Sequence, residues 1–170
     1  MDDNTSKIRF IVLNSSDLTY ENGSNNNYLY GGIGHFEFSD AQIEWLKKCL
    51  VVPHGYGVVV FSHCQIYPSM VNPAINSNSA YNCDKLHKVL EDFKASGGDL
   101  IACFHGHCHQ DLVFDYNGIK HISTTTVCNG NYKDCATENI NIDTMVIDRN
   151  LRKIYTFRMK DVTKNRVIDY

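Results

Sequence analysis

The stretch DLIACFHGHCHQD, residues 99–111, joins a run of apolar residues to a cluster of histidines. Residues 99–104 are short and apolar, which predicts a strand covered on both faces. His105, His107 and His109 follow at alternate positions. In open α/β sheets, binding sites gather at the carboxyl ends of the strands. The stretch therefore predicts both a central strand and a candidate site at its end.

The same pattern continues toward the N-terminus. Residues 7–14 (KIRFIVLN) and 56–63 (YGVVVFSH) are also predicted to be buried strands, and the second of them ends in His63. Residues 39–50 and 83–95 carry apolar side chains at helical spacing, which predicts two amphipathic helices between the strands.

The C-terminal third of the chain is rich in strand signals. Asn117-Gly118 is a strong signal for a two-residue hairpin, and a last hairpin is predicted over residues 142–159. The order strand, helix, strand, helix, strand, followed by hairpins, predicts an α/β fold with a mixed sheet and helices packed on it. Residues 1–170 show no repeat and no linker, so we predict a single domain.

The bulk composition limits the classes of function. At 43% hydrophobic and 21% charged residues, a chain of 170 residues is predicted to be globular, and its net charge of -3 gives no electrostatic case for nucleic acid. We expect no membrane segment and no signal peptide. Seven scattered cysteines favour a reducing compartment over a disulfide framework, so the predicted location is cytoplasmic.

His63 and His107 occupy equivalent places, because each closely follows a buried strand. Neighbouring strands would bring the two imidazoles to one edge of the sheet, and neutral imidazole binds zinc, manganese and iron. An extended backbone would turn His107 and His109 to the same side, and Gly106 is expected to allow a tight turn beside them. We predict that His63, His107 and His109 bind metal; the alternative is hydrogen-bonded histidines at a sheet edge.

The other histidines are predicted to be structural. We expect His105 and His121 to pack in or beside the core, with a phosphate contact as the alternative for His121. His54 and His87 are predicted to lie on the surface. The sequence identifies no catalytic and no substrate-binding residue.

A few further side chains are candidates for additional ligands. Two thiols lie beside the candidate histidines, so a zinc site that mixes Cys and His is a second interpretation. Two carboxylates are near enough in the predicted fold to add oxygen ligands. These four residues are Cys64, Cys108, Asp17 and Asp111.

The blocks SHCQ, residues 62–65, and GHCH, residues 106–109, resemble the last two signature blocks of the calcineurin-like metallophosphoesterases. Those blocks are a strand-end His and Gly-His-x-His. The helix that contains Trp45 and the terminal hairpin, followed by Arg158 and Arg166, are also similar to the C-terminal half of a bacterial or phage member. The resemblance implies half of a four-layer αββα sandwich.

The resemblance also implies the hydrolysis of a phosphate ester at a dinuclear metal centre. Two divalent ions, Mn, Fe or Zn, would be bound in the complete enzyme, with partial or absent occupancy in this chain. On this pattern His63 and His107 bind one ion, and His109 binds or faces the other. The substrate is expected to be a phosphorylated compound whose class the sequence does not define.

The first three blocks of the family have no counterpart in this sequence. They are Asp-x-His, Gly-Asp-x-x-Asp and Gly-Asn-His-Asp/Glu, and the near-misses at residues 84–87, 98–102 and 130–132 each break the pattern. We therefore expect a C-terminal fragment that is inactive or weak without an N-terminal half. The alternative is a non-catalytic binding or assembly module on a decayed phosphoesterase scaffold.

A half-sandwich would leave an apolar sheet face without its cover, and such faces favour association. The expected partners are therefore further copies of this chain, or a polypeptide that supplies the N-terminal half.

Overall fold

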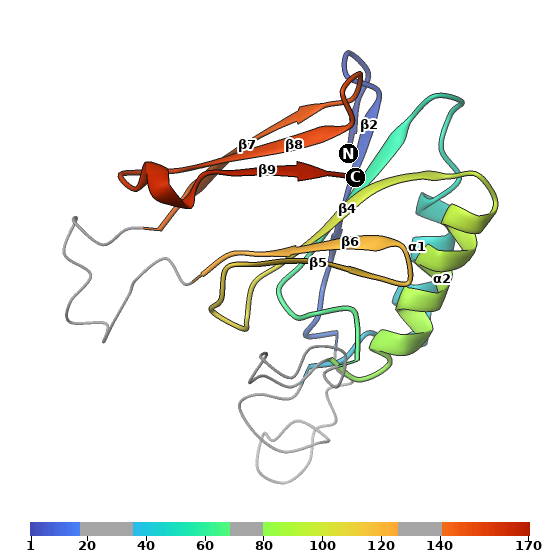
Figure 1. Ribbon diagram of the computed structural model, residues 1–170. Coiled ribbons are helices and arrows are strands. Elements are labelled where there is room, and N and C mark those ends of the chain that lie inside the picture. Colours follow the sequence, from blue (N-terminus) through green and yellow to red (C-terminus); the bar gives the residue numbers. More distant parts are fainter. Residues whose placement is uncertain (18–35, 69–79, 126–140) are drawn as a thin grey trace, which may run out of the picture.

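The computed structural model describes residues 1–17, 36–68, 80–125 and 141–170. These residues form a six-stranded mixed sheet with the order β1-β2-β3-β4-β6-β5 and a three-stranded antiparallel sheet with the order β7-β8-β9. Figure 1 shows the two α-helices on one face of the larger sheet and the smaller sheet on its other side. The predicted α/β class, with a mixed sheet and helices packed on it, is confirmed.

The larger sheet contains β1 (Asp2–Asp3), β2 (Ile8–Leu13), β3 (Gly57–Ser62), β4 (Asp99–His105), β5 (Leu112–Tyr116) and β6 (Ile119–Ser123). The smaller sheet contains β7 (Asp143–Asp148), β8 (Lys153–Arg158) and β9 (Arg166–Asp169). The helices are α1 (Asp40–Cys49), α2 (Cys83–Ala95) and the short 3-10 helix η3 (Val162–Lys164).

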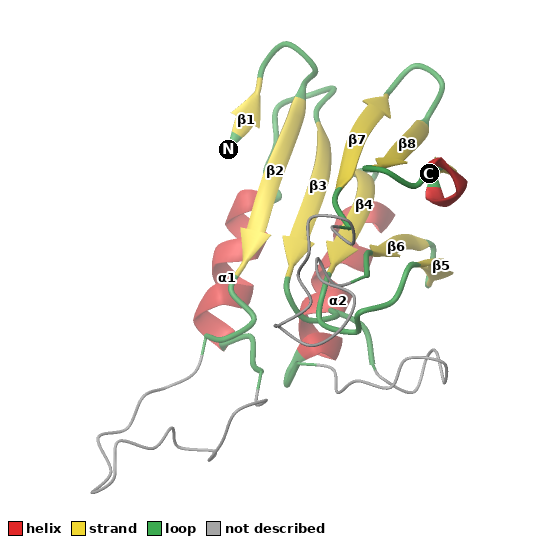
Figure 2. Ribbon diagram, turned by 90° about the vertical axis from the view of Figure 1, so that its left-hand side faces the viewer, coloured by secondary structure: helices red, strands yellow, loops and turns green. Residues whose placement is uncertain are grey.

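Strands β2, β3, β4 and β6 run parallel to one another. Figure 2 shows the larger sheet with α1 and α2 behind it, and the arrowheads of β2, β3 and β4 point to one edge. The loops that follow β3 and β4 therefore start side by side. This arrangement places His63 next to the histidines that follow β4.

The helices cover one face of the larger sheet through an apolar core. Leu46 of α1 and Leu86 and Leu90 of α2 are fully buried there, together with Val58 and Val60 of β3. Burying a leucine side chain contributes about 2 kcal/mol. Packing of these stripes, rather than intrinsic propensity, is what stabilises short helices of this kind.

A second apolar cluster fills part of the space between the two sheets. Ile154 and Ile168 of the smaller sheet pack there against Val59 and Ile101 of the larger one. The last hairpin is present where it was predicted, but it pairs with β9 in a sheet of its own rather than extending the larger sheet. Val12 of β2 is 71% exposed, so the smaller sheet leaves part of this face uncovered.

The smaller sheet is also tied to the larger one by ion pairs. At the start of β4, Asp99 accepts hydrogen bonds from Arg149 at 2.9 Å and from Arg152 at 3.1 Å. Arg149 also donates to three backbone carbonyls, of which the Gly55 oxygen lies at 2.7 Å. The turn between β7 and β8 is thereby held against the amino-terminal edge of the larger sheet.

The part of the chain that the structure describes contains no helix that is both long and apolar enough to cross a membrane.

Candidate functional site

The carboxyl ends of β3 and β4 bring His63 and His107 together. Their ring centroids are 5.3 Å apart, in an edge-to-face arrangement. The Gly106 amide donates to the His63 carbonyl at 3.0 Å, which joins the two strand ends. The Phe36 ring packs against both imidazoles, with its centroid 4.6 Å from His107 and 5.8 Å from His63.

The turn beyond β4, residues 106–111, is named here the histidine loop. It is not extended, so the predicted reason for His107 and His109 to face the same side is wrong. Both residues adopt the left-handed region, with φ of 60° and 53°, and the tight turn is made by them rather than by Gly106. For a side chain other than glycine, this conformation costs about 1–2 kcal/mol per residue. Contacts elsewhere in the fold must therefore hold the loop.

The three predicted ligands, His63, His107 and His109, are named here the open trio. Partial burial lowers the pKa of His107, and the neighbouring charges of His63 and His109 lower it further. His63 and His109 are exposed. A lowered pKa keeps His107 neutral at pH 7, which is the form that binds metal.

The donors around the open trio fit a metal only in part. Two adjacent imidazoles suit one divalent ion, but the described residues contain no group of three or more His, Cys, Asp or Glu side chains placed to hold one. The metal-binding roles of His63, His107 and His109 therefore stay a prediction. Further oxygen or nitrogen ligands would be needed to complete a stable site.

Three of the four predicted additional ligands are engaged elsewhere or buried in the core. Asp17 accepts hydrogen bonds from Ser39 and from the Gln42 amide, and Asp111 is bound by Arg158. Burial raises the pKa of Cys64 to about 12, so its thiol does not ionise near neutral pH. Cys64 packs in the apolar core between the larger sheet and the helices, so the structure argues against a mixed site that uses Cys64.

A second set of histidines lies in the core beside α2. His87 Nε2 lies 3.2 Å from His121 Nε2, and His121 Nδ1 lies 2.9 Å from His105 Nε2. At the outer end, Glu91 Oε1 lies 3.0 Å from His87 Nδ1 and accepts a hydrogen bond from Asn117 at 2.6 Å. These three histidines are named here the buried trio.

Burial controls the chemistry of the buried trio. It lowers the pKa of His105 to about 3 and lowers those of His87 and His121 as well, although Glu91 opposes the shift at His87. All three imidazoles are therefore neutral at pH 7. The predicted core positions of His105 and His121 are confirmed, but the predicted surface position of His87 is wrong, because His87 is only 2% exposed.

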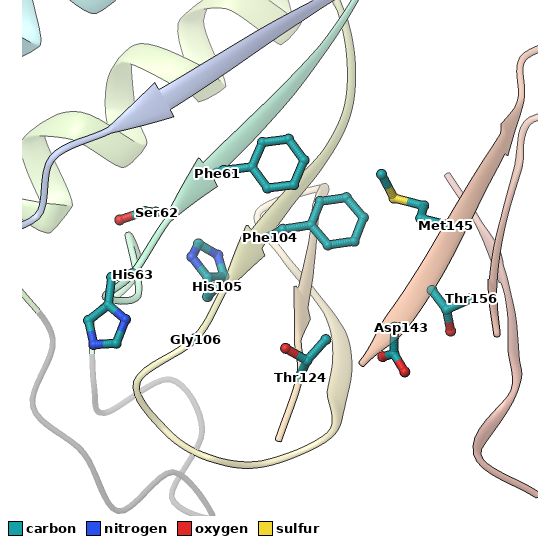
Figure 3. Close-up of a pocket in the computed structure, with 10 residues that line it drawn as sticks. All are labelled: Phe61, Ser62, His63, Phe104, His105, Gly106, Thr124, Asp143, Met145 and Thr156. Carbon is teal, nitrogen blue, oxygen red and sulfur yellow. The ribbon is translucent and has the colours of Figure 1, made fainter. Parts of the chain in front are cut away.

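A pocket of about 420 Å³ lies between the two sheets and reaches the open trio at His63. Figure 3 shows Phe61 and Phe104 on the larger sheet and Asp143, Met145 and Thr156 on the smaller one. The Asp143 carboxylate is paired with Arg158 and Arg166. The polar wall of this pocket is therefore neutralised, and Asp143 is not a free carboxylate for metal or proton transfer.

The two near-misses for the absent blocks that the structure describes do not reach the open trio. Residues 84–87 lie on α2, where His87 belongs to the buried trio, and residues 98–102 lie at the start of β4. Residues 130–132 lie outside the described residues. The described part of the chain thus offers no replacement for the carboxylates of those blocks near the open trio.

Comparison with known proteins supports the resemblance at the level of the family. No family model matches the chain. The chain is 28% identical over 116 residues to the 3',5'-cyclic adenosine monophosphate phosphodiesterase CpdA of Escherichia coli K12, and equally to the protein of that name in Haemophilus influenzae. Each alignment covers 67% of this chain and 39% of the relative. The chain therefore spans about two-fifths of the length of the curated relatives that it matches.

Proposed function

We propose that this chain carries part of a metal-dependent phosphoesterase centre, with His63 and His107 among its ligands. The observation that best supports the proposal is the approach of their rings to 5.3 Å at the carboxyl edge of a parallel sheet. Sites in open α/β proteins form at this edge. The similarity to the CpdA phosphodiesterases supports a phosphate ester as the substrate.

The residues have separate roles in this proposal. His63 and His107 would hold one divalent ion and His109 would bind or face a second, with Mn, Fe or Zn as the metal. Such ions polarise a phosphoryl group and lower the pKa of a bound water. The neutral state of His107, favoured by partial burial, makes its imidazole available at neutral pH without the loss of a proton.

The centre is incomplete within the described residues, because the histidine pair has no carboxylate beside it. We propose that the missing ligands come from an N-terminal half, with this chain forming the C-terminal half, and that the chain alone is weak or inactive. Self-association remains our proposal for the partly uncovered face of the larger sheet, where Val12 is exposed. Light scattering at micromolar concentration would test it, and a monomeric mass would contradict it.

Hydrolysis assays with Mn²⁺ test the proposal, using 3',5'-cyclic AMP and bis(4-nitrophenyl) phosphate as substrates. We expect slow, Mn²⁺-dependent hydrolysis that is lost in His63→Ala and in His107→Ala. The exposed His54, at the opposite edge of the sheet, provides the control variant His54→Ala, which should keep the wild-type rate. Hydrolysis that survives both site variants would contradict the proposal. Metal binding without hydrolysis would fit both an inactive C-terminal half and the non-catalytic module.

A further inference from the structure

The histidine loop has two unfavourable backbone conformations, so its contacts decide whether the open trio keeps its arrangement. The end of β6 supplies the first set. Ser123 Oγ donates to the Gln110 carbonyl at 2.9 Å, and Thr125 Oγ1 donates to the His109 carbonyl at 3.1 Å. The Thr125 amide also donates to Asp111 Oδ1 at 3.1 Å. These bonds fasten the far end of the loop to the neighbouring strand.

The smaller sheet supplies the second set through one arginine. Arg158 of β8 donates from Nη2 to Asp111 Oδ1 at 2.6 Å and from Nη1 to Asp111 Oδ2 at 3.3 Å. Its Nε donates to Asp143, and its Nη2 also donates to Asp143 Oδ2 at 3.2 Å. The Arg158 side chain is only 3% exposed. One buried guanidinium therefore joins the histidine loop to β7.

The positive and negative charges in the network around Arg158 are balanced. Arg166 of β9 donates to Asp143 Oδ2 at 3.1 Å, to the Ser123 carbonyl at 3.2 Å and to Thr156 Oγ1 at 3.1 Å. Two arginines thus face two carboxylates, and the group spans both sheets. A buried pair is costly to break singly, because the remaining charge is left without compensation. The position of Asp111 is fixed accordingly.

We propose that Arg158 is a positioning residue for the candidate metal centre: by holding Asp111, it keeps the histidine loop in the conformation that places His107 beside His63. The inference deepens the proposed function and rests on it for the identity of the ligand, a divalent cation. It assigns to the smaller sheet the task of shaping the loop that carries the histidines. Arg158 touches neither metal nor substrate in this account.

The geometry also predicts how substitutions of Arg158 and Asp111 affect the histidine loop. The guanidinium presents its N–H groups as a planar fork that two carboxylates occupy together. Lysine keeps the charge but offers a single ammonium, so Arg158→Lys should release Asp111 or Asp143. Asp111→Asn removes the charge on the loop side and leaves the pairs of Arg158 and Arg166 with Asp143 in place. Both variants therefore loosen the loop by different routes.

The test measures Mn²⁺ affinity by titration calorimetry, together with amide hydrogen exchange of residues 106–111. We expect Arg158→Lys and Asp111→Asn to weaken Mn²⁺ binding about 10–100-fold, as is usual when a residue behind a metal ligand is changed. Exchange protection of the histidine loop should fall in both. Arg152→Gln is the matched control, because it breaks an arginine–aspartate pair between the same sheets at the opposite edge. It should leave both readouts at wild-type values.

The two readouts separate the failure of this inference from that of the proposed function. Wild-type Mn²⁺ affinity and wild-type loop protection in Asp111→Asn would overturn the positioning role. An equal loss in Arg152→Gln would also overturn it, because the effect would then come from general loosening of the sheet junction. If the wild-type chain binds no Mn²⁺ without an N-terminal half, hydrogen exchange alone decides whether Arg158 holds the loop. If Arg158→Lys does not fold, Asp111→Asn provides the answer.

Discussion

The open trio and the buried trio contain the same side chain in two different environments. His105 and His107 are separated by one glycine, yet they belong to different sets. In the buried trio, ring nitrogens of successive histidines lie 2.9 and 3.2 Å apart, and His87 Nδ1 lies beside Glu91. In the open trio His63 and His109 face solvent. Because the buried trio is enclosed and paired, it contributes to the stability of the fold. The open trio lies at the carboxyl edge of the larger sheet, where a ligand can reach it.

The largest expected difference between the trios is in the dependence of stability on pH. The buried trio has pKa values below those of the unfolded chain. Below about pH 6.5 the unfolded histidines therefore bind protons that the folded ones do not. The free energy of unfolding should be at its full value above that pH and fall as the pH decreases, by up to about 4 kcal/mol per pH unit for three histidines. Urea unfolding between pH 8 and 5 measures this, and a flat profile would contradict it.

Removing the middle member of the buried trio should have the next largest effect. His121→Leu leaves Nε2 of His87 and of His105 without their partner inside the core. Each unsatisfied buried group costs about 1–3 kcal/mol, so we expect a loss of about 3 kcal/mol in the free energy of unfolding at pH 8. The variant should also have a shallower pH profile. The control His54→Ala, on the surface, should change the free energy of unfolding by less than about 0.5 kcal/mol. An equally small effect of His121→Leu would show that the buried trio does not contribute to stability.

A smaller change in stability is expected in the open trio, where the unfavourable contribution comes from backbone conformation and not from burial. His109 is exposed and has φ of 53°. Glycine adopts this conformation without a steric penalty, so His109→Gly should be more stable than His109→Ala by about 1 kcal/mol. Both variants remove the imidazole, so the difference between their stabilities measures the backbone preference at residue 109. Equal stabilities in thermal unfolding would mean that the left-handed turn is not maintained in solution.

The features that depend on local pattern could be predicted from the sequence. Apolar runs indicated β3 and β4, and the approach of His63 to His107 followed from the expectation that these strands are neighbours. Asn117-Gly118 indicated the hairpin of β5 and β6, and the turn is present with positive φ at both residues. These predictions needed only side-chain periodicity and turn chemistry.

The features that depend on tertiary contacts could not be predicted in the same way. His87 lies at helical spacing from Cys83 and Leu90 on the buried face of α2; that spacing was a signal, but a polar residue does not count in an apolar stripe. The left-handed turn of the histidine loop is held by Arg158 of β8 and by Thr125, which follows β6; both are distant from the loop in sequence. No local pattern encodes such contacts.

The most direct test of the central claim is the binding of Mn²⁺ to the purified chain, measured by equilibrium dialysis at pH 7.5. His63→Ala and His107→Ala are compared with the wild type and with His54→Ala. We predict that the wild type and His54→Ala bind Mn²⁺ and that both site variants lose at least tenfold in affinity, about 1.4 kcal/mol. Unchanged binding in the two site variants would contradict the assignment of His63 and His107 as metal ligands. No binding by the wild type would mean that the site needs the absent carboxylates or has decayed.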